Sequence, residues 1–486
     1  MNCSLKLHLK KLGLAALCTI PAHAFAQETP APEAAPAEAE VAPAPVATPA
    51  PVVVATKPAV TSKWDSTFYG FIEADTIYDS TQGYSDAPGN SLIPAFTTFA
   101  GQKPKLQFSV RNSRIGYKIA APEISGLKIS GIAEMDFLGN QPADSSLSLT
   151  TTGVDAKGNP ATDKGTISQS ESSIWNNPAF RARHLVMKVE NPYVDLWFGQ
   201  TWDLFGGQSV VHPASVFIQG LPGQVYGRTA QIRLLHTFKT DAVNVEVAVA
   251  AARAPQSLAA MPDLQAALKV QLNGWKGVHT NGSTGTGYDP LTVSVSGIYR
   301  TLDLSTDPTA TARTTNGWGL SVDAFLPILR GTPEDRSNAL AITASYVMGA
   351  GIADQYSGMK TGVGAPSGVT IDGNLATNDS SKNPTAVKLT SMLFGLQYYL
   401  PFAQGKWWVA GNFSTWGSDN AKDLVVANGG KAGTALKSGQ FLSGALFFDP
   451  TPAFRVGAEF AQTKTTLGDD TSNANNRFQF SAFYLF

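Results

Sequence analysis

The sequence predicts an all-β chain that folds as a 16-stranded antiparallel transmembrane β-barrel. Three observations carry this prediction. Apolar and polar residues alternate with a period of two along runs of about ten residues, the length that a tilted strand needs to cross a bilayer. The connections between the runs alternate between short and long. The chain ends on FQFSAFYLF, an alternating aromatic run, whereas soluble domains usually end in a polar tail.

The first 62 residues are predicted to stand apart from the barrel. Residues 1–26 resemble a signal peptide, with lysines, an apolar run and an A-x-A cleavage site that ends at Ala26. Cys18 leaves a lipoprotein anchor open as an alternative. Residues 27–62 are mostly Ala, Pro, Val, Thr and Glu, which predicts a disordered periplasmic segment, either a tether or a tail without a role.

Residues 63–486 are assigned to the barrel. The 486-residue chain has a formal net charge of −1 and only 15% charged residues, so nothing marks a nucleic-acid binder. No run of 18 apolar residues follows the signal peptide. Strands are predicted near 67–79, 105–119, 126–138, 181–190, 193–201, 226–238, 242–253, 264–273, 291–304, 317–328, 339–350, 386–400, 405–416, 439–448, 453–464 and 476–486.

The connections alternate in length, as in an outer-membrane barrel with periplasmic turns and extracellular loops. The long ones are 80–102, 139–178, 203–224, 352–384, 420–438 and 464–475. The polar connection 273–290 makes the boundaries of the eighth strand the least determined. A secreted all-β enzyme or a propeller would also show many short strands, but it has no reason to sort its loops by length.

Aromatic residues near the strand ends fit the girdles at the two membrane interfaces. They include Tyr398, Tyr399, Trp407, Trp408 and Tyr484. The last strand is predicted to pair with the first near Phe68, because closure removes the free edge. The terminal Phe486 behind alternating aromatics also resembles the signal that the outer-membrane assembly machinery binds.

In the stretch VRNSRIGYKIAAP the apolar set changes phase, which predicts a β-bulge near Asn112 and Ser113. Arginine at mid-depth on the lipid face costs roughly 2–4 kcal/mol, so the cations of these strands are predicted to face the lumen. A position at the headgroup rim is the alternative for each. The predicted pore-lining basic residues are Arg111, Arg114, Lys118, Arg181, Arg183, Arg228 and Arg233.

Carboxylates share the same predicted inner faces. The predicted pore-lining acidic residues are Glu73, Asp75, Glu134 and Asp136. A ring of arginines would concentrate anions, whereas opposite charges across a pore would give a transverse field. The sequence leaves this balance open.

The motifs RNSRIGYKIAAP, SGIAEMDFLGN, RARHLVMKVE, GQTWDLFGG and RTAQIRLLHTF follow one another in the order and spacing seen in DcaP-like outer-membrane porins. The resemblance covers about 68–238. It implies a trimeric barrel that passes small anions such as dicarboxylates, with the loop 203–224 folded inward as the constriction. The Pro/Ala-rich segment departs from the charged heptads common in that family, so a coiled-coil stalk is not expected.

The loop 203–224 suits a constriction on its own terms, because glycines permit tight bends and apolar residues could pack it against the wall. An extracellular or trimer-contact role is the alternative. The polar residues predicted for the constriction are Asp203, Gln208, His212 and Gln219, and the apolar ones are Phe205, Val210, Val211, Val216, Phe217 and Ile218.

These features predict a porin in the outer membrane of a Gram-negative bacterium, a homotrimer among lipid and lipopolysaccharide, without cofactor, metal or catalytic residues. Two alternatives stay open. One is a barrel-based hydrolase, for which His279, Ser283 and Asp289 are the candidate residues. The other is a structural barrel that anchors a periplasmic partner through its proline-rich arm.

Overall fold

The computed structural model describes residues 64–82, 93, 95–139, 147–154, 160–167, 178–207, 210, 212–217, 220–255, 259–280, 285–305, 313–357 and 375–486. The predicted signal peptide (1–26) and the Pro/Ala-rich segment (27–62) lie outside these residues and stay predictions. No helix in the described part of the chain is long and apolar enough to span a bilayer.

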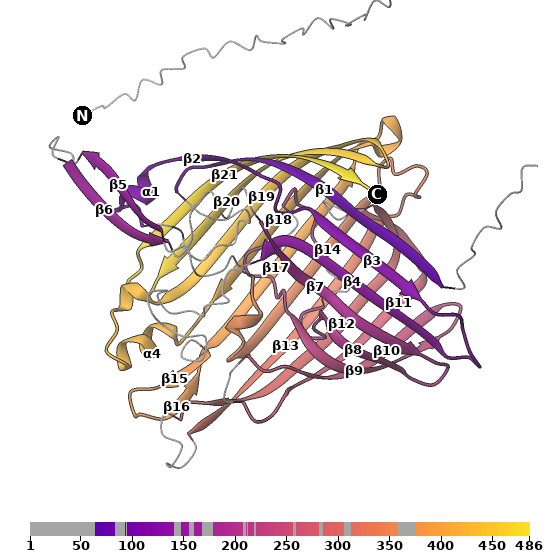
Figure 1. Ribbon diagram of the computed structural model, residues 1–486, viewed down its shortest axis with the longest axis horizontal. Coiled ribbons are helices and arrows are strands. Elements are labelled where there is room, and N and C mark those ends of the chain that lie inside the picture. The colour runs from indigo at the N-terminus through magenta and orange to yellow at the C-terminus, as the bar shows by residue number, and fades with distance from the viewer. Residues whose placement is uncertain are drawn as a thin grey trace, which may run out of the picture. The chain divides into compact units, whose positions relative to one another are not determined.

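One antiparallel sheet makes up the wall (Figure 1). Its strands are β1 (Asp65–Asp79), β2 (Lys105–Ser109), β3 (Arg114–Ala120), β4 (Lys128–Gly139), β7 (Ala179–Glu190), β8 (Asp195–Trp202), β9 (Arg228–Lys239), β10 (Val243–Ala252), β11 (Asp263–Thr280), β12 (Thr286–Asp303), β13 (Thr314–Leu329), β14 (Leu340–Ala350), β17 (Lys388–Tyr399), β18 (Trp407–Gly417), β19 (Leu436–Thr451), β20 (Phe454–Leu467) and β21 (Ser472–Leu485).

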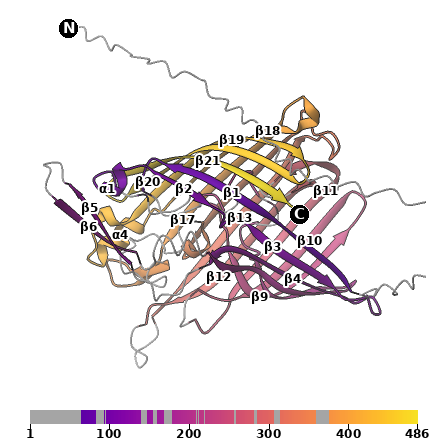
Figure 2. The ribbon, with the colours of Figure 1, turned by 45° about the horizontal axis from the view of Figure 1, so that its top comes forward.

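The sheet closes on itself, because β1 pairs with β2 and β3 on one side and with β21 on the other. β2 and β3 are two halves of one wall strand, so the described sheet has sixteen strands around its ring. Figure 2 shows the closure, with β21 alongside β1. Gly70 N donates to Phe486 O at 2.9 Å, and the rings of Phe68 and Phe486 stack at 5.4 Å, which confirms the predicted pairing.

The predicted bulge lies between β2 and β3. Phe71 pairs with Arg114 and Asp75 pairs with Ser109, so the four residues 110–113 oppose the three residues 72–74. The backbone N–H of Glu73 donates to Ser113 Oγ at 2.9 Å within the bulge. The extra residue changes the phase of the strand and keeps the apolar residues on the outer face on both sides of it.

The two faces of the wall differ in polarity. On β13, Leu320 and Val322 are exposed on the outer face, whereas Ser321 and Asp323 are fully buried on the inner face. Large apolar side chains are exposed in the same way along the other strands of the ring. An apolar outer face around a polar interior is the pattern of a barrel that spans a membrane.

Because the strands alternate in direction, the two kinds of connection gather at opposite ends of the barrel. We call these ends the short-turn mouth and the long-loop mouth. The connections of the long-loop mouth include α1 (Phe99–Gln102), β5 (Leu147–Val154), β6 (Pro160–Ile167), η1 (Ala353–Gln355), β15 (Ala376–Asn378), β16 (Pro384–Ala386), α4 (Ala421–Ala427) and η3 (Ala432–Thr434). The short-turn mouth carries η2 (Ala403–Gly405).

Two predicted connections are wrong. The polar connection 273–290 is mostly strand, because β11 continues to Thr280 and β12 begins at Thr286. The loop 464–475 is also shorter, since β20 and β21 pair as far as Thr466 and Ser472. Thr465 is buried on the inner face, so a polar β-branched residue forms strand where the sequence suggested loop.

The girdle prediction is wrong for Tyr399 and Trp408. Both side chains are completely buried on the inner face of the wall, where they belong to one apolar cluster with Phe447. Trp408 stacks on Phe447 with ring centroids 3.9 Å apart. Tyr484 is exposed on the outer face, as a girdle residue should be.

Candidate pore and constriction

The segment between β8 and β9 turns into the barrel where β8 ends. The backbone N–H of Phe205 donates to Gln265 Oε1 on β11 at 3.2 Å, and that of Gly206 donates to Ser296 Oγ on β12 at 3.0 Å. Gly206 has a φ of +91°, and a Cβ there would lie 2.2 Å from Val225. This turn therefore requires glycine.

The same segment reaches the opposite wall. Asn412 Nδ2 on β18 donates to Ala214 O at 2.7 Å. Glu459 Oε2 on β20 accepts hydrogen bonds from Ser215 Oγ and Val216 N, both at 2.7 Å. β18 and β20 follow β8 by eight and ten strands in the ring of sixteen, so the loop 203–224 crosses the lumen. The predicted inward-folded constriction loop is confirmed.

Apolar side chains attach the loop at both ends. Phe205 is fully buried in a cluster with Ile298 on β12, and Phe217 meets Phe441 on β19 edge-to-face with centroids 6.0 Å apart. Val216 joins the cluster of Trp408, and Val210 packs beside Phe217. Val211 and Ile218 lie outside the described residues.

The predicted polar residues of the loop differ in position. Asp203 is buried at the base of the loop, where its Oδ1 accepts hydrogen bonds from Thr229 Oγ1 at 2.6 Å and Gln231 Nε2 at 3.3 Å. Asp203 lies outside the strands, and burial raises the pKa of its carboxyl to about 6 against the opposing hydrogen bonds. His212 lies within the lumen, its ring 6.0 Å from that of Trp202. Gln208 and Gln219 fall outside the described residues.

Two carboxylates on β4 bind three of the predicted arginines. Arg183 Nε donates to Glu134 Oε1 at 2.8 Å, and its Nη1 donates to Asp136 Oδ2 at 3.2 Å. Arg181 Nε donates to Asp136 Oδ1 at 2.9 Å, and Arg114 Nε lies 3.5 Å from Glu134 Oε1. A register shift between β4 and β7 brings Arg183 into this inner cluster.

The two predicted arginines on β9 make no ion pair within the described residues. Arg228 Cζ lies 4.6 Å from the ring centre of Trp202, and its buried Nη1 has no hydrogen-bond partner there. Arg233 Nη2 donates to Gln231 Oε1 at 2.9 Å, and the guanidinium lies over Trp197. Both keep a positive charge that no carboxylate cancels at contact distance.

Arg111 and Lys118 lie apart from this cluster. Arg111 Nε donates to Phe137 O at 3.4 Å beside the bulge. Lys118 is exposed, with its Nζ 4.8 Å from the ring centre of Tyr69 toward the short-turn mouth. That position resembles the rim that the sequence left as the alternative.

Glu73 and Asp75 are buried on the inner face of β1. Asp75 accepts hydrogen bonds from Asn112 Nδ2 at 2.9 Å, Gln479 Nε2 at 3.0 Å and Ser481 Oγ at 2.5 Å. This carboxylate therefore connects the bulge to the closing strand, which is a structural role.

Trp202 and Tyr226, at the two ends of the constriction loop, were not among the site residues predicted from the sequence. Their rings meet edge-to-face at 4.7 Å beside Arg228. Tyr226 lies outside the strands. Burial alone would raise the pKa of its phenol, but Arg183, Arg228 and Arg114 outweigh burial and lower it to about 7. The sequence feature that could have indicated them is an aromatic residue at each end of a loop that arginines flank.

A cavity of about 290 Å³ adjoins the base of the loop. It is lined by charged side chains of both signs, including Glu134, His184, Arg233, Glu246 and Lys269. Among the described residues, no group of three or more His, Cys, Asp or Glu side chains is arranged to hold a metal. His279 Nδ1 lies 3.2 Å from Asp289 Oδ2, and Ser283 falls outside the described residues.

No protein-family model and no curated protein matches the sequence. Among solved structures, the outer membrane channel DcaP of Acinetobacter baumannii is 16% identical, with a TM-score of 0.57, over 87% of this chain and 97% of that one. An anion-selective porin from Comamonas acidovorans is 10% identical, with a TM-score of 0.49, over 87% of this chain and all of that one (100%). OmpF of Salmonella typhi with daunomycin is 8% identical, with a TM-score of 0.45, over 87% and 97%.

At 16% identity, the likeness to DcaP is a likeness of fold. The chain therefore has the sixteen-stranded barrel fold of an outer-membrane channel.

Proposed function

We propose that the chain is an outer-membrane porin, a passive diffusion channel for small hydrophilic solutes that favours anions. The main observation in support of a channel is that the loop 203–224 crosses a barrel with a polar interior. It is held to one wall at Phe205 and to the opposite wall by Glu459 on β20. A barrel of sixteen strands is too wide for wall side chains alone to fill, and a crossing loop sets the width of the remaining passage.

The charges beside the loop support the anion preference. Three arginines share the carboxylates Glu134 and Asp136, while Arg228 and Arg233 make no ion pair in the described structure. Positive charge thus exceeds negative charge on this wall. The low-dielectric protein wall concentrates the electric field of this excess positive charge in the lumen. This field raises the local concentration of anions.

Planar-bilayer recording tests both parts of the proposal. Discrete conductance steps are expected for a porin, and the reversal potential in a salt gradient should have the sign of anion selectivity. Absence of steps from correctly folded protein would contradict the channel function. A cation-selective reversal potential would contradict the role of the arginines alone.

We further propose a homotrimer in the outer membrane. The exposed apolar outer face needs lipid or a neighbouring subunit to cover it, and Phe68, Leu106, Phe108 and Phe180 are its most exposed side chains on β1, β2 and β7. Native mass spectrometry in mild detergent should give three chains per particle, and conductance should rise in three coupled levels. A purely monomeric spectrum would contradict the trimer.

A further inference from the structure

The hairpin of β11 and β12 is longer than a simple turn at the short-turn mouth would require. Leu272 pairs with Leu291, and Lys276 then pairs with Pro290. The three residues 273–275 therefore leave the ladder as a bulge. Beyond it the strands pair again as far as Thr280 and Thr286. We call the described residues 276–280 and 285–290 of this hairpin the hairpin end. A bulge of this kind bends the strands away from their course.

The hairpin end packs on the inner face of the wall. The ring of His279 lies 5.0 Å from that of Phe325 on β13. A Cβ on Gly277 would lie 2.3 Å from Cβ of Pro327, two residues farther along the same inner face. Val278 is only 1% exposed and belongs to the apolar cluster of Trp408. The hairpin end therefore lies inside the barrel.

Hydrogen bonds hold the first strand of the hairpin end to β17. Thr280 N donates to Gln397 Oε1 at 2.9 Å, and the hydroxyl groups of Thr280 and Tyr399 are 2.6 Å apart. Gln397 and Tyr399 both face the lumen and are buried. These contacts attach the hairpin end to a strand four places farther round the ring.

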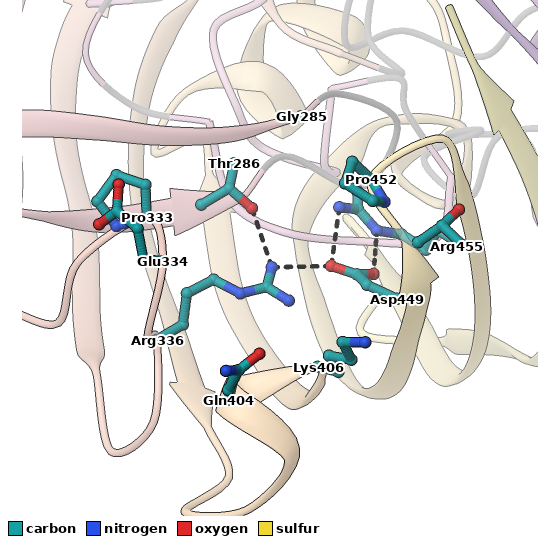
Figure 3. A pocket seen from close by; sticks show the side chains of 11 residues that line it. Gly285, Thr286, Pro333, Glu334, Arg336, Gln404, Lys406, Asp449, Pro452 and Arg455 are labelled. Carbon is teal, nitrogen blue, oxygen red and sulfur yellow. Dashed lines mark hydrogen bonds and ion pairs between the residues drawn. The ribbon is translucent and has the colours of Figure 1, made fainter.

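An ion-pair cluster holds the second strand of the hairpin end (Figure 3). Arg336 Nη1 donates to Thr286 Oγ1 at 2.9 Å and to Asp449 Oδ2 at 2.8 Å. Arg455 Nε donates to the other oxygen, Asp449 Oδ1, at 2.7 Å. All three charged side chains are at most 9% exposed. The cluster joins the β13–β14 turn and β19–β20 to the hairpin end.

The hairpin end and the constriction loop meet inside the barrel. Ala214 and Val216 of the loop share one apolar cluster with Val278 of the hairpin end, together with Trp408 and Phe447 of the wall. The loop enters from the long-loop mouth, and the hairpin end enters from the short-turn mouth. Together they cover the inner face from β13 to β19.

We propose that the hairpin end is a second constriction element. It supports the constriction loop on the side of the short-turn mouth and blocks the β13–β19 side of the lumen. The inference rests on the proposed channel function. Solutes then pass along the opposite wall, where Arg114, Arg183 and Arg228 lie. The ion-pair cluster of Arg336, Asp449 and Arg455 keeps the hairpin end in place.

The first test removes the hairpin end and keeps the barrel register. Because Leu272 and Leu291 are paired, the residues 273–290 can be replaced by Asn-Gly, a two-residue turn that suits a hairpin. Single-channel conductance should rise by about 1.5-fold or more, with the sign of ion selectivity kept. Unchanged conductance in a variant with normal heat-modifiable migration on gels would overturn the proposal.

The second test releases the hairpin end without shortening it. Asp449→Asn removes the charge between the two arginines, whereas Asp470→Asn removes an exposed ion-pair partner of Lys437 and serves as the matched control. Current noise and brief conductance changes should increase at least about twofold in Asp449→Asn only, because a buried pair depends on both partners. Equal noise in both variants would contradict the proposal that the ion-pair cluster keeps the hairpin end in place.

A third measurement does not depend on conductance. Both cysteines, Cys3 and Cys18, precede residue 27, so a protein expressed without 1–26 and carrying Gln397→Cys has a single thiol. A charged thiol reagent should label it at least about tenfold faster once the hairpin end is removed, because reaction requires access. Lys118→Cys, exposed on β3, gives the reference rate.

Equal labelling of Gln397→Cys with and without the hairpin end would overturn the proposal. If the hairpin end shields the thiol but the intact protein gives no conductance steps, the porin function fails while the placement of the hairpin end stands. The two failures are therefore distinguishable.

Discussion

Glu459 on β20 accepts a 2.7 Å hydrogen bond from the backbone N–H of Val216, a residue of the loop that starts at β8 on the far side of the lumen. The same carboxylate oxygen accepts a second bond from Ser215 Oγ. Hydrogen bonds to a charged group contribute about 1.5–3 kcal/mol each. One side chain thus holds the far end of the constriction loop.

Glu459→Ala should loosen this attachment. We expect a higher mean conductance and more current noise, since the loop loses two bonds at its far end. Glu123→Ala, which removes an exposed carboxylate paired with Lys128 in a short turn, is the matched control. Identical recordings from the two variants would contradict the role of Glu459.

Arg228→Ala should weaken the anion preference and leave the barrel intact. Arg228 makes no ion pair in the described structure, so its removal leaves no carboxylate unpaired. A unit charge 4 Å from an ion contributes about 1 kcal/mol in water, which corresponds to a roughly fivefold fall in the local anion concentration and so to a lower anion-to-cation permeability ratio. Reversal potentials in a salt gradient measure this permeability ratio. Arg228→Lys should restore most of the preference.

Arg183→Ala should destabilise the barrel. Arg183 is 1% exposed and binds both Glu134 and Asp136, so its loss leaves two buried carboxylates short of a cation. Breaking such a buried pair costs about 3–5 kcal/mol. The temperature of heat-modifiable unfolding in detergent should fall clearly below that of the wild type. An unchanged temperature would show that the cluster does not stabilise the fold.

The ion preference should depend on pH through Tyr226. The phenol is neutral below its pKa of about 7 and negative above it, facing Arg183, Arg228 and Arg114. As the pH rises through 7, the phenolate cancels one positive charge, so the anion preference should fall between pH 5.5 and pH 8.5. Tyr226→Phe should lack this step. The same step in both proteins would assign it to another group, such as Asp203, whose pKa of about 6 lies in the same range.

The sequence predicted the barrel because its period of two is local and repeats around the ring. The bulge near Asn112 and Ser113 was visible for the same reason, as a change of phase within one strand. The inward loop could be predicted from its apolar residues and from the family resemblance, and Phe205 and Phe217 pack as expected.

The hairpin end could not be predicted from local sequence. Gly277 and Pro290 are typical of a loop, but both lie in paired strand. Gly277 lies against Pro327 of β13, and the neighbouring His279 and Thr280 contact Phe325 of β13 and Tyr399 of β17. The inward position of Tyr399 and Trp408 has the same origin. A segment inside the lumen makes the inner wall apolar, and alternation alone cannot show which face that is.

The pairing of charges also depends on long-range register. Arg183 reaches both carboxylates of β4 only because β4 and β7 shift against each other at Glu134. The sequence predicted inner faces for these residues, but whether opposite charges meet along one wall or across the lumen depends on that shift.

The ring of strands is divided between two tasks. One arc, from β13 to β20, anchors the two inward segments through Phe325, Trp408 and Glu459. The other arc, around β3, β7 and β9, carries Arg114, Arg183 and Arg228. A saturation mutagenesis screen scored separately for abundance and for uptake should therefore give two maps: substitutions on the first arc should change abundance, and substitutions on the second should change which solutes enter the cell.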